Sequence, residues 1–124
     1  MKNLICTLFL LIGTTVLAQG TDLSNDYNRI EEKVIRWRRE IHQNPELSNR
    51  EFKTAEKIAA HLNSLGIAVQ TGVAHTGVVG ILKGGQPGKV LALRADIDAL
   101  PVTERNDLAF KSTVTSEFLG EQVG

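Results

Sequence analysis

The chain of 124 residues has one cysteine, Cys6, so it cannot form an internal disulfide. Stability must come from packing or from sequence beyond this chain. The chain also lacks an excess of positive or negative charge, because 14 basic residues balance 14 acidic ones. The basic residues form no patch. Nothing in this balance favours nucleic acid or an acidic surface as a partner. The length suits one small domain.

Long hydrophobic runs are lacking except at the start. Lys2 precedes an apolar segment, residues 4–17, and Val16-Leu17-Ala18 ends in the small-residue pattern of a cleavage site. We therefore predict a signal peptide over residues 1–18, cut after Ala18. A membrane anchor is the alternative, but the run is short and no basic flank follows it. The sequence thus predicts a secreted or periplasmic protein without a stable membrane anchor, with residues 19–124 as its mature domain.

Two segments have the periodicity of amphipathic helices. Apolar residues at steps of three and four predict the first helix from Tyr27 to Ile41, with Ser24 or Asp26 as its cap. Pro45 ends this helix. The next segment, Ser48-Asn49-Arg50-Glu51, matches a capping box and predicts a helix that continues to Leu65 and ends at Gly66.

Three strands are predicted after the helices, over residues 67–70, 77–82 and 89–96. The turn at residues 83–88 suits an antiparallel hairpin, whereas the apolar run that begins at Val90 is typical of an interior strand covered by helices. The fold class is therefore α/β, with two amphipathic helices packed on a mixed and incomplete sheet. We expect mostly loop after Pro101 and assign nothing at residues 113–123.

The candidate site lies at the end of the last predicted strand. If the chain stays extended there, Arg94, Asp96 and Asp98 project to one side. Ligands bind beyond the carboxyl ends of strands in open α/β sheets. As lone residues, however, such carboxylates more often cap a turn or pair with an arginine, and Arg94 is two positions away from Asp96.

Metal-ligand spacing is lacking among the three histidines. None stands within motif spacing of another or of a run of carboxylates. His42 falls in the last turn of the first helix, where the helix dipole favours an imidazolium. His61 is expected on a helix face, and His75 in an exposed loop. The chain therefore offers no predicted metal ligand.

Several short motifs follow one another in an order that resembles a known family. They are Arg38-Arg39-Glu40-Ile41-His42-Gln43-Asn44-Pro45-Glu46-Leu47, Glu51, Thr54-Ala55, Thr76-Gly77-Val78-Val79, Leu93-Arg94-Ala95-Asp96-Ile97-Asp98-Ala99-Leu100-Pro101 and Glu104. From about Val34 onward the chain resembles the amino-terminal part of peptidase family M20, the aminoacylase and carboxypeptidase-like two-metal hydrolases. It is most similar to the amidohydrolase branch, which includes hippurate-hydrolase-like and auxin-conjugate-hydrolase-like enzymes.

The resemblance implies a metal-dependent amidohydrolase that cleaves the amide bond of N-acyl amino acids or small peptides. It implies a divalent metal, Zn or Mn, whose bound hydroxide attacks the amide while a glutamate further along the chain shuttles the proton. In the wider family the strand carries a His-x-Asp motif, which here reads Arg94-Ala95-Asp96. Arginine has no free lone pair, so Arg94 cannot be a metal ligand.

This departure matches the amidohydrolase branch, whose ligands include a Cys-Gly-His-Asp segment expected downstream of this chain. Asp96 is then expected to orient a metal ligand or the catalytic glutamate, and Asp98 to line the site or to be structural. We expect the fragment alone to be inactive, and homo-oligomers of the complete protein to form through a further domain. The alternative is a small exported α/β binding or accessory domain without enzymatic activity.

Overall fold

The structure is a computed structural model that describes residues 23–124. The predicted signal peptide and its cut after Ala18 lie outside the described residues. Two compact units are distinguished, one ending at Glu32 and the other running from Lys33 to Gly124. No helix within residues 23–124 is both long enough and apolar enough to span a bilayer.

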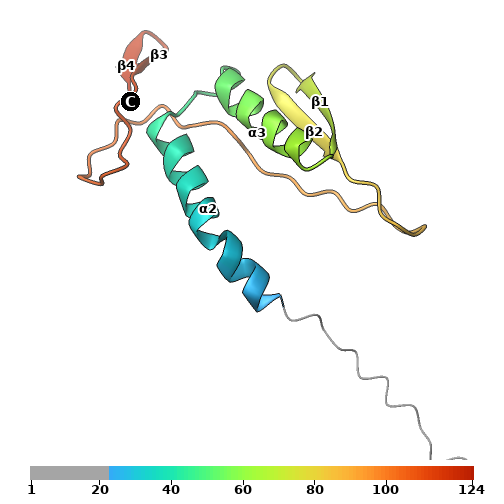
Figure 1. Cartoon of the computed structure of the whole chain (residues 1–124). Coiled ribbons are helices and arrows are strands. Elements are labelled where there is room, and N and C mark those ends of the chain that lie inside the picture. Colours follow the sequence, from blue (N-terminus) through green and yellow to red (C-terminus); the bar gives the residue numbers. More distant parts are fainter. Residues whose placement is uncertain (1–22) are drawn as a thin grey trace, which may run out of the picture. The chain divides into compact units, whose positions relative to one another are not determined.

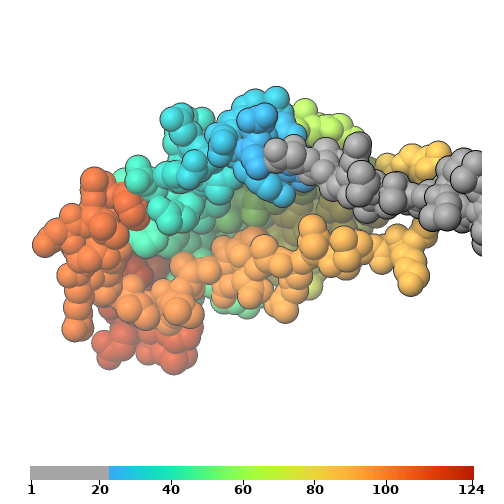
Figure 2. Space-filling view, turned by 90° about the horizontal axis from the view of Figure 1, so that it is seen from below, coloured from blue at the N-terminus to red at the C-terminus, as the bar shows by residue number. Residues whose placement is uncertain are grey.

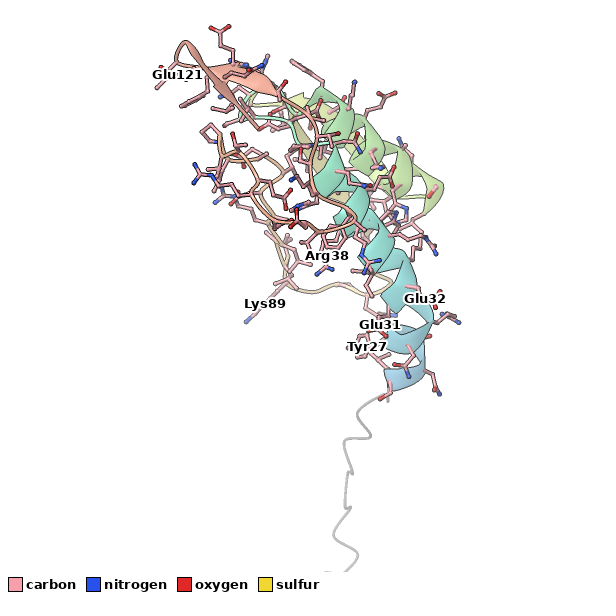
Figure 3. All side chains as sticks on the ribbon, turned by 90° about the vertical axis from the view of Figure 1, so that its left-hand side faces the viewer. Tyr27, Glu31, Glu32, Arg38, Lys89 and Glu121 are labelled. Carbon is pink, nitrogen blue, oxygen red and sulfur yellow. The ribbon has the colours of Figure 1, made fainter. Side chains whose placement is uncertain are left out.

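Helix α2 spans Ser24–Gln43 and begins before the first apolar residue of its stripe. Its first turn forms because the backbone N–H of Tyr27 donates to the carbonyl of Leu23, 2.9 Å away. Asp26 lies inside this turn, where its charge faces the positive end of the helix dipole. Tyr27 is exposed on the early part of the helix (Figure 3).

The predicted apolar stripe of α2 is covered only toward its end. Val34 is exposed, whereas Trp37 and Ile41 are half-buried, and the helix has no fully buried residue. The Trp37 ring meets the ring of His61 on the next helix edge to face, with centroids 4.5 Å apart. Glu40 also pairs with Lys57. The second half of α2 is therefore the half that packs against α3.

Helix α3 spans Phe52–Ser64, and its start differs from the predicted capping box. Glu51 occupies the N-cap position and makes no capping hydrogen bond. The Glu46 carboxylate caps the helix instead, accepting the backbone N–H of Lys53 at 3.1 Å and of Thr54 at 2.8 Å. The capping-box prediction for Ser48 is wrong, because residues 47–50 form a tight turn that places the serine ahead of the helix.

The end of α3 confirms the prediction for Gly66. This residue has φ 73°, and its N–H donates to the carbonyl of Asn63 at 2.9 Å. The N–H of Ile67 reaches back to the carbonyl of Leu62 at 3.1 Å, which completes a Schellman motif. Glycine is favoured at this position because its backbone is left-handed.

Strands β1, Ala68–Val73, and β2, Gly77–Ile81, pair antiparallel with Val69 opposite Gly80. Helix α3 packs on this hairpin (Figure 1). A Cβ atom added at Gly80 would lie 3.1 Å from a methyl of Leu62 and 3.2 Å from one of Ile67. The close approach of α3 thus depends on glycine in β2, and the α/β class of two helices and small sheets is confirmed.

The third predicted strand, residues 89–96, is absent from the described structure. Val90 is 98% exposed and Leu93 is 90% exposed, and Figure 2 shows the stretch in gold to orange on an open surface. The prediction of an interior strand is wrong here, because β1 and β2 pair only with each other and no described segment pairs with this one. The described sheets are antiparallel rather than mixed.

A second hairpin lies where we assigned nothing. Strands β3, Ser116–Phe118, and β4, Glu121–Val123, are joined by Leu119 and Gly120, both with positive φ. The Arg50 guanidinium donates to the carbonyl of Glu117 at 3.0 Å, which ties this hairpin to the linker between α2 and α3. The Gly in the turn was the only local signal for it.

Candidate functional site

The acidic segment, residues 94–99, follows the apolar stretch that begins at Val90 and is held in place at Ala99. The backbone N–H of Ala99 donates to the carbonyl of Glu46 at 2.8 Å, and Leu47 forms a parallel bridge with Ala99. Leu47 is among the few buried apolar residues of the described chain. The linker that joins α2 to α3 therefore positions the acidic segment.

A hollow of about 430 Å³ lies beside this segment and is lined mostly by polar groups. Arg94, Asp96 and Asp98 all line it, as the alternation along an extended chain led us to expect. Ser48 and Glu51 from the α2–α3 linker complete its wall. The structure thus brings the three predicted residues together in one place.

Arg94 and Asp96 form an ion pair within this hollow, with Nη2 and Oδ1 2.8 Å apart. Both side chains are open to water, at 88% and 71% exposure. An exposed pair of this kind contributes about 0–1 kcal/mol to stability. Asp98 makes no hydrogen bond or ion pair with the described residues. The arginine pairing weighed from the sequence is therefore the contact that Asp96 makes within residues 23–124.

Glu51 is the buried charge of the same hollow. It is 5% exposed, and its Oε2 accepts the hydroxyl of Thr76 at 2.7 Å. Burial acts to raise the pKa of Glu51, but hydrogen bonds from Thr76 and from the backbone of residues 49–51 outweigh it, so the pKa lies below its ordinary value. Glu51 was predicted as part of a capping box and is one of the motifs of the family resemblance, but neither pattern predicted that its carboxylate is buried.

A second cavity, of about 640 Å³, also borders the acidic segment. Its floor is largely apolar and includes Ile97 and Leu100, while Arg38 and His42 of α2 line its wall. Asp98 lines this cavity as well as the first hollow. Asp98 is therefore the acidic residue that both spaces share.

Glu104 is the hydrogen-bond centre of this second cavity. Its carboxylate accepts Nε2–H of His42 at 2.9 Å, Nδ2–H of Asn106 at 2.5 Å and the backbone N–H of Ser112 at 2.7 Å. The Ser112 N–H, followed by His42 and Asn106, lowers the pKa of Glu104 from 4.5 to about 2. Reasoning on spacing missed this cluster, because His42 and Glu104 are 62 positions apart.

The three histidines lie apart, as their spacing predicts. His42 occupies the last turn of α2, His61 packs on Trp37, and His75 lies in the exposed β1–β2 turn, where its ring contacts Phe52. Across residues 23–124 there is no group of three or more His, Cys, Asp or Glu side chains that could hold a metal ion. These residues alone therefore do not fit a dinuclear metal centre.

The chain is similar in sequence to several known hydrolases. The chain is 53% identical over 93 residues to "Thermostable carboxypeptidase 2" of Saccharolobus solfataricus, which covers 74% of this chain and 24% of that protein. It is 44% identical over 85 residues to the "N-acyl-L-amino acid amidohydrolase" of Geobacillus stearothermophilus, covering 68% and 23%. It is 42% identical over 91 residues to the "Hippurate hydrolase" of Campylobacter jejuni, covering 73% and 22%. No protein-family model matches the chain.

A solved structure has the same fold over most of the chain. It is the YXEP protein of Bacillus subtilis, described as a dinuclear metal binding peptidase from the M20 family. The match has a TM-score of 0.65 at 40% identity and covers 70% of this chain and 25% of that one. The chain thus spans about a quarter of the length of the relatives it matches.

These comparisons identify the class of protein to which the chain is related. The chain is homologous to carboxypeptidases and amidohydrolases, and its fold is part of an M20 peptidase domain. The resemblance predicted from the motifs, to family M20 and to amidohydrolases and hippurate hydrolases within it, is confirmed.

Proposed function

We propose that the complete protein is a metal-dependent amidohydrolase that cleaves the amide bond of N-acyl amino acids or small peptides. The observation that carries the proposal is the identity of 42–53% to proteins named carboxypeptidase, amidohydrolase and hippurate hydrolase. Because the chain spans only about a quarter of these relatives, the activity is assigned to the complete protein rather than to this part of it.

The proposed cofactor is a divalent metal, Zn or Mn. The described residues include no cluster that could hold it, so we assign the ligands to sequence outside this chain. Arg94 is excluded as a ligand, because its guanidinium has no lone pair to donate and already pairs with Asp96.

Within this chain we assign Asp96 as a positioning residue. Its carboxylate lines a polar hollow and is held at one oxygen by Arg94, which leaves the second oxygen to orient a group supplied by the rest of the protein. Asp98 is assigned to the lining of the site, because it borders both spaces and has no partner among residues 23–124.

The experiment compares the complete protein with the 124-residue chain. Each is incubated with a panel of N-acyl amino acids and small peptides, with Zn or Mn and after chelation. The proposal expects turnover by the metal-loaded complete protein, loss of turnover on chelation, and none by the 124-residue chain. Turnover by the short chain, or an inactive complete protein with its metal bound, would refute the assignment. The second result would favour the alternative of a binding or accessory domain.

We propose that the complete protein forms a homo-oligomer through a domain outside this chain. We also propose that the protein is exported and cleaved after Ala18. Lys2, the apolar segment of residues 4–17 and Ala18 support export. Amino-terminal sequencing of the exported product should begin at Gln19. Recovery of the uncut chain in the membrane fraction would instead favour the alternative, in which residues 4–17 anchor the protein in a membrane.

A further inference from the structure

The loop that follows the acidic segment closes on one carboxylate. Glu104 accepts hydrogen bonds from Asn106 and from the backbone N–H of Ser112, eight residues further on. Asn106 in turn accepts the backbone N–H of Leu108 at 3.0 Å. We call residues 104–112 with His42 the Glu104 clasp. The charge of Glu104 thus fixes the path of a segment that has no regular secondary structure.

The clasp is attached to the last turns of α2 at several points. His42 donates to Glu104, and the ring of Phe110 meets the ring of His42 edge to face, with centroids 5.6 Å apart. The guanidinium of Arg39 lies 5.0 Å from the centroid of Phe110. The side-chain amide of Gln43 donates to the carbonyl of Ala109 at 3.5 Å. These contacts hold the loop against the carboxyl end of a helix.

Two attachments to the end of α2 and its linker follow Asp98 along the chain. Ala99 is held by the carbonyl of Glu46, just after α2, and Glu104 is held by His42, in the last turn of α2. Only residues 100–103 lie between these two attachments. Asp98 and Glu104 also line the same cavity. Release of Glu104 would leave in place the hydrogen bond at Ala99, the nearer of the two attachments that follow Asp98, but the wall of the shared cavity would lose its second support.

We propose that Glu104 is a positioning residue for the hydrolase site, acting through the placement of Asp96 and Asp98. This inference rests on the proposed function. A carboxylate suits the position because it only accepts hydrogen bonds, and three donors converge on it. Glutamine has the same shape, but one of its two terminal atoms is a donor, so it would oppose His42 or Ser112.

The test uses the complete protein and its Glu104→Gln variant. We expect kcat to fall about 10- to 100-fold while KM stays within about twofold, since a small misplacement costs rate more than binding. Metal content per chain should stay unchanged, and hydrogen exchange should accelerate at the Ser112 amide. The matched control is Glu121→Gln, at the start of β4 (Figure 3). The side chain of Glu121 makes no hydrogen bond or ion pair with residues 23–124, so this change should leave all four readouts unchanged.

Faster exchange at Ser112 with an unchanged kcat would overturn the inference, because the clasp would then be merely structural. A fall in kcat that only matches a fall in the folded fraction would overturn it equally. If Glu104→Gln does not fold, Asn106→Ala removes a single donor and should lower kcat by a smaller factor, and an unchanged kcat would overturn the inference. An inactive wild-type protein would refute the proposed function and this inference together, and the wild-type assay alone identifies that case.

Discussion

The backbone N–H of Ala99 donates a 2.8 Å hydrogen bond to the carbonyl of Glu46, across 53 positions of sequence. The two residues belong to the acidic segment and to the linker after α2. The same Glu46 caps α3 through its side chain. One residue thus joins the acidic segment and the start of the second helix, which explains how this part of the chain places Asp96 and Asp98.

The cap of α3 can be tested by Glu46→Ala. Its carboxylate accepts two backbone N–H groups and the hydroxyl of Thr54, so its removal should lower the free energy of unfolding by about 1 kcal/mol. Thermal unfolding of the complete protein measures the change. Ser48→Ala is the control and should leave the free energy of unfolding almost unchanged. A larger loss of stability from Ser48→Ala than from Glu46→Ala would show that Ser48 caps the helix after all.

The Glu104 cluster predicts a specific dependence on acid. Folding lowers the pKa of this carboxyl from 4.5 to about 2, so the unfolded chain binds more protons between these values. The stabilisation is therefore complete above pH 4.5 and is lost as the pH falls toward 2. Carboxyl NMR of the labelled protein should show Glu104 titrating near 2. A Glu104 resonance that titrates near 4.5 would contradict the observed hydrogen bonds.

The end of α3 predicts that Gly66→Ala destabilises the protein through the backbone alone. An added Cβ would meet no atom within 4 Å, but φ is 73°, so the left-handed conformation should cost about 1–2 kcal/mol. Gly85→Ala is the matched control, because its Cβ also meets open space without a positive φ. Equal melting temperatures for the two variants would contradict the Schellman motif.

The exposed stretch at residues 90–93 predicts self-association of the 124-residue chain. Val90 and Leu93 offer apolar side chains and an unpaired extended backbone to other chains. Leu93→Lys should reduce the associated fraction in sedimentation velocity. Lys83→Arg, an exposed change in the preceding turn that preserves charge, should not. A wild-type chain that stays monomeric at high concentration would contradict the prediction.

Local patterns predicted the parts of the fold that local forces determine. The periodicity of residues 52–65 and the glycine at 66 locate α3 and its end, because side-chain spacing and backbone freedom act within a few residues. Strands β1 and β2 were predicted within a few residues of their observed bounds for the same reason. Their pairing was not predicted: the expected hairpin joined residues 77–82 to residues 89–96, whereas β2 pairs with β1.

Long-range partners were not predictable in this way. The cap from Glu46 depends on the turn at Asn49, and the Glu104 cluster on a histidine 62 positions away. The apolar run at Val90 correctly signals a demand for burial, but a strand also needs a paired neighbour, which residues 23–124 do not supply. Arg94, Asp96 and Asp98 were predictable as a group, because alternation along an extended backbone is local.

The central proposal is that Asp96 of the acidic segment positions a group of the active site in a metal-dependent amidohydrolase. It is tested most directly by N-acyl amino acid turnover and metal content of the complete protein and its Asp96→Asn variant, with exposed Glu121→Gln as control. Loss of the Asp96 charge should lower turnover by about one to two orders of magnitude, as for residues that orient metal ligands. The control should match the wild type. Unchanged activity and unchanged metal content in Asp96→Asn would contradict the account.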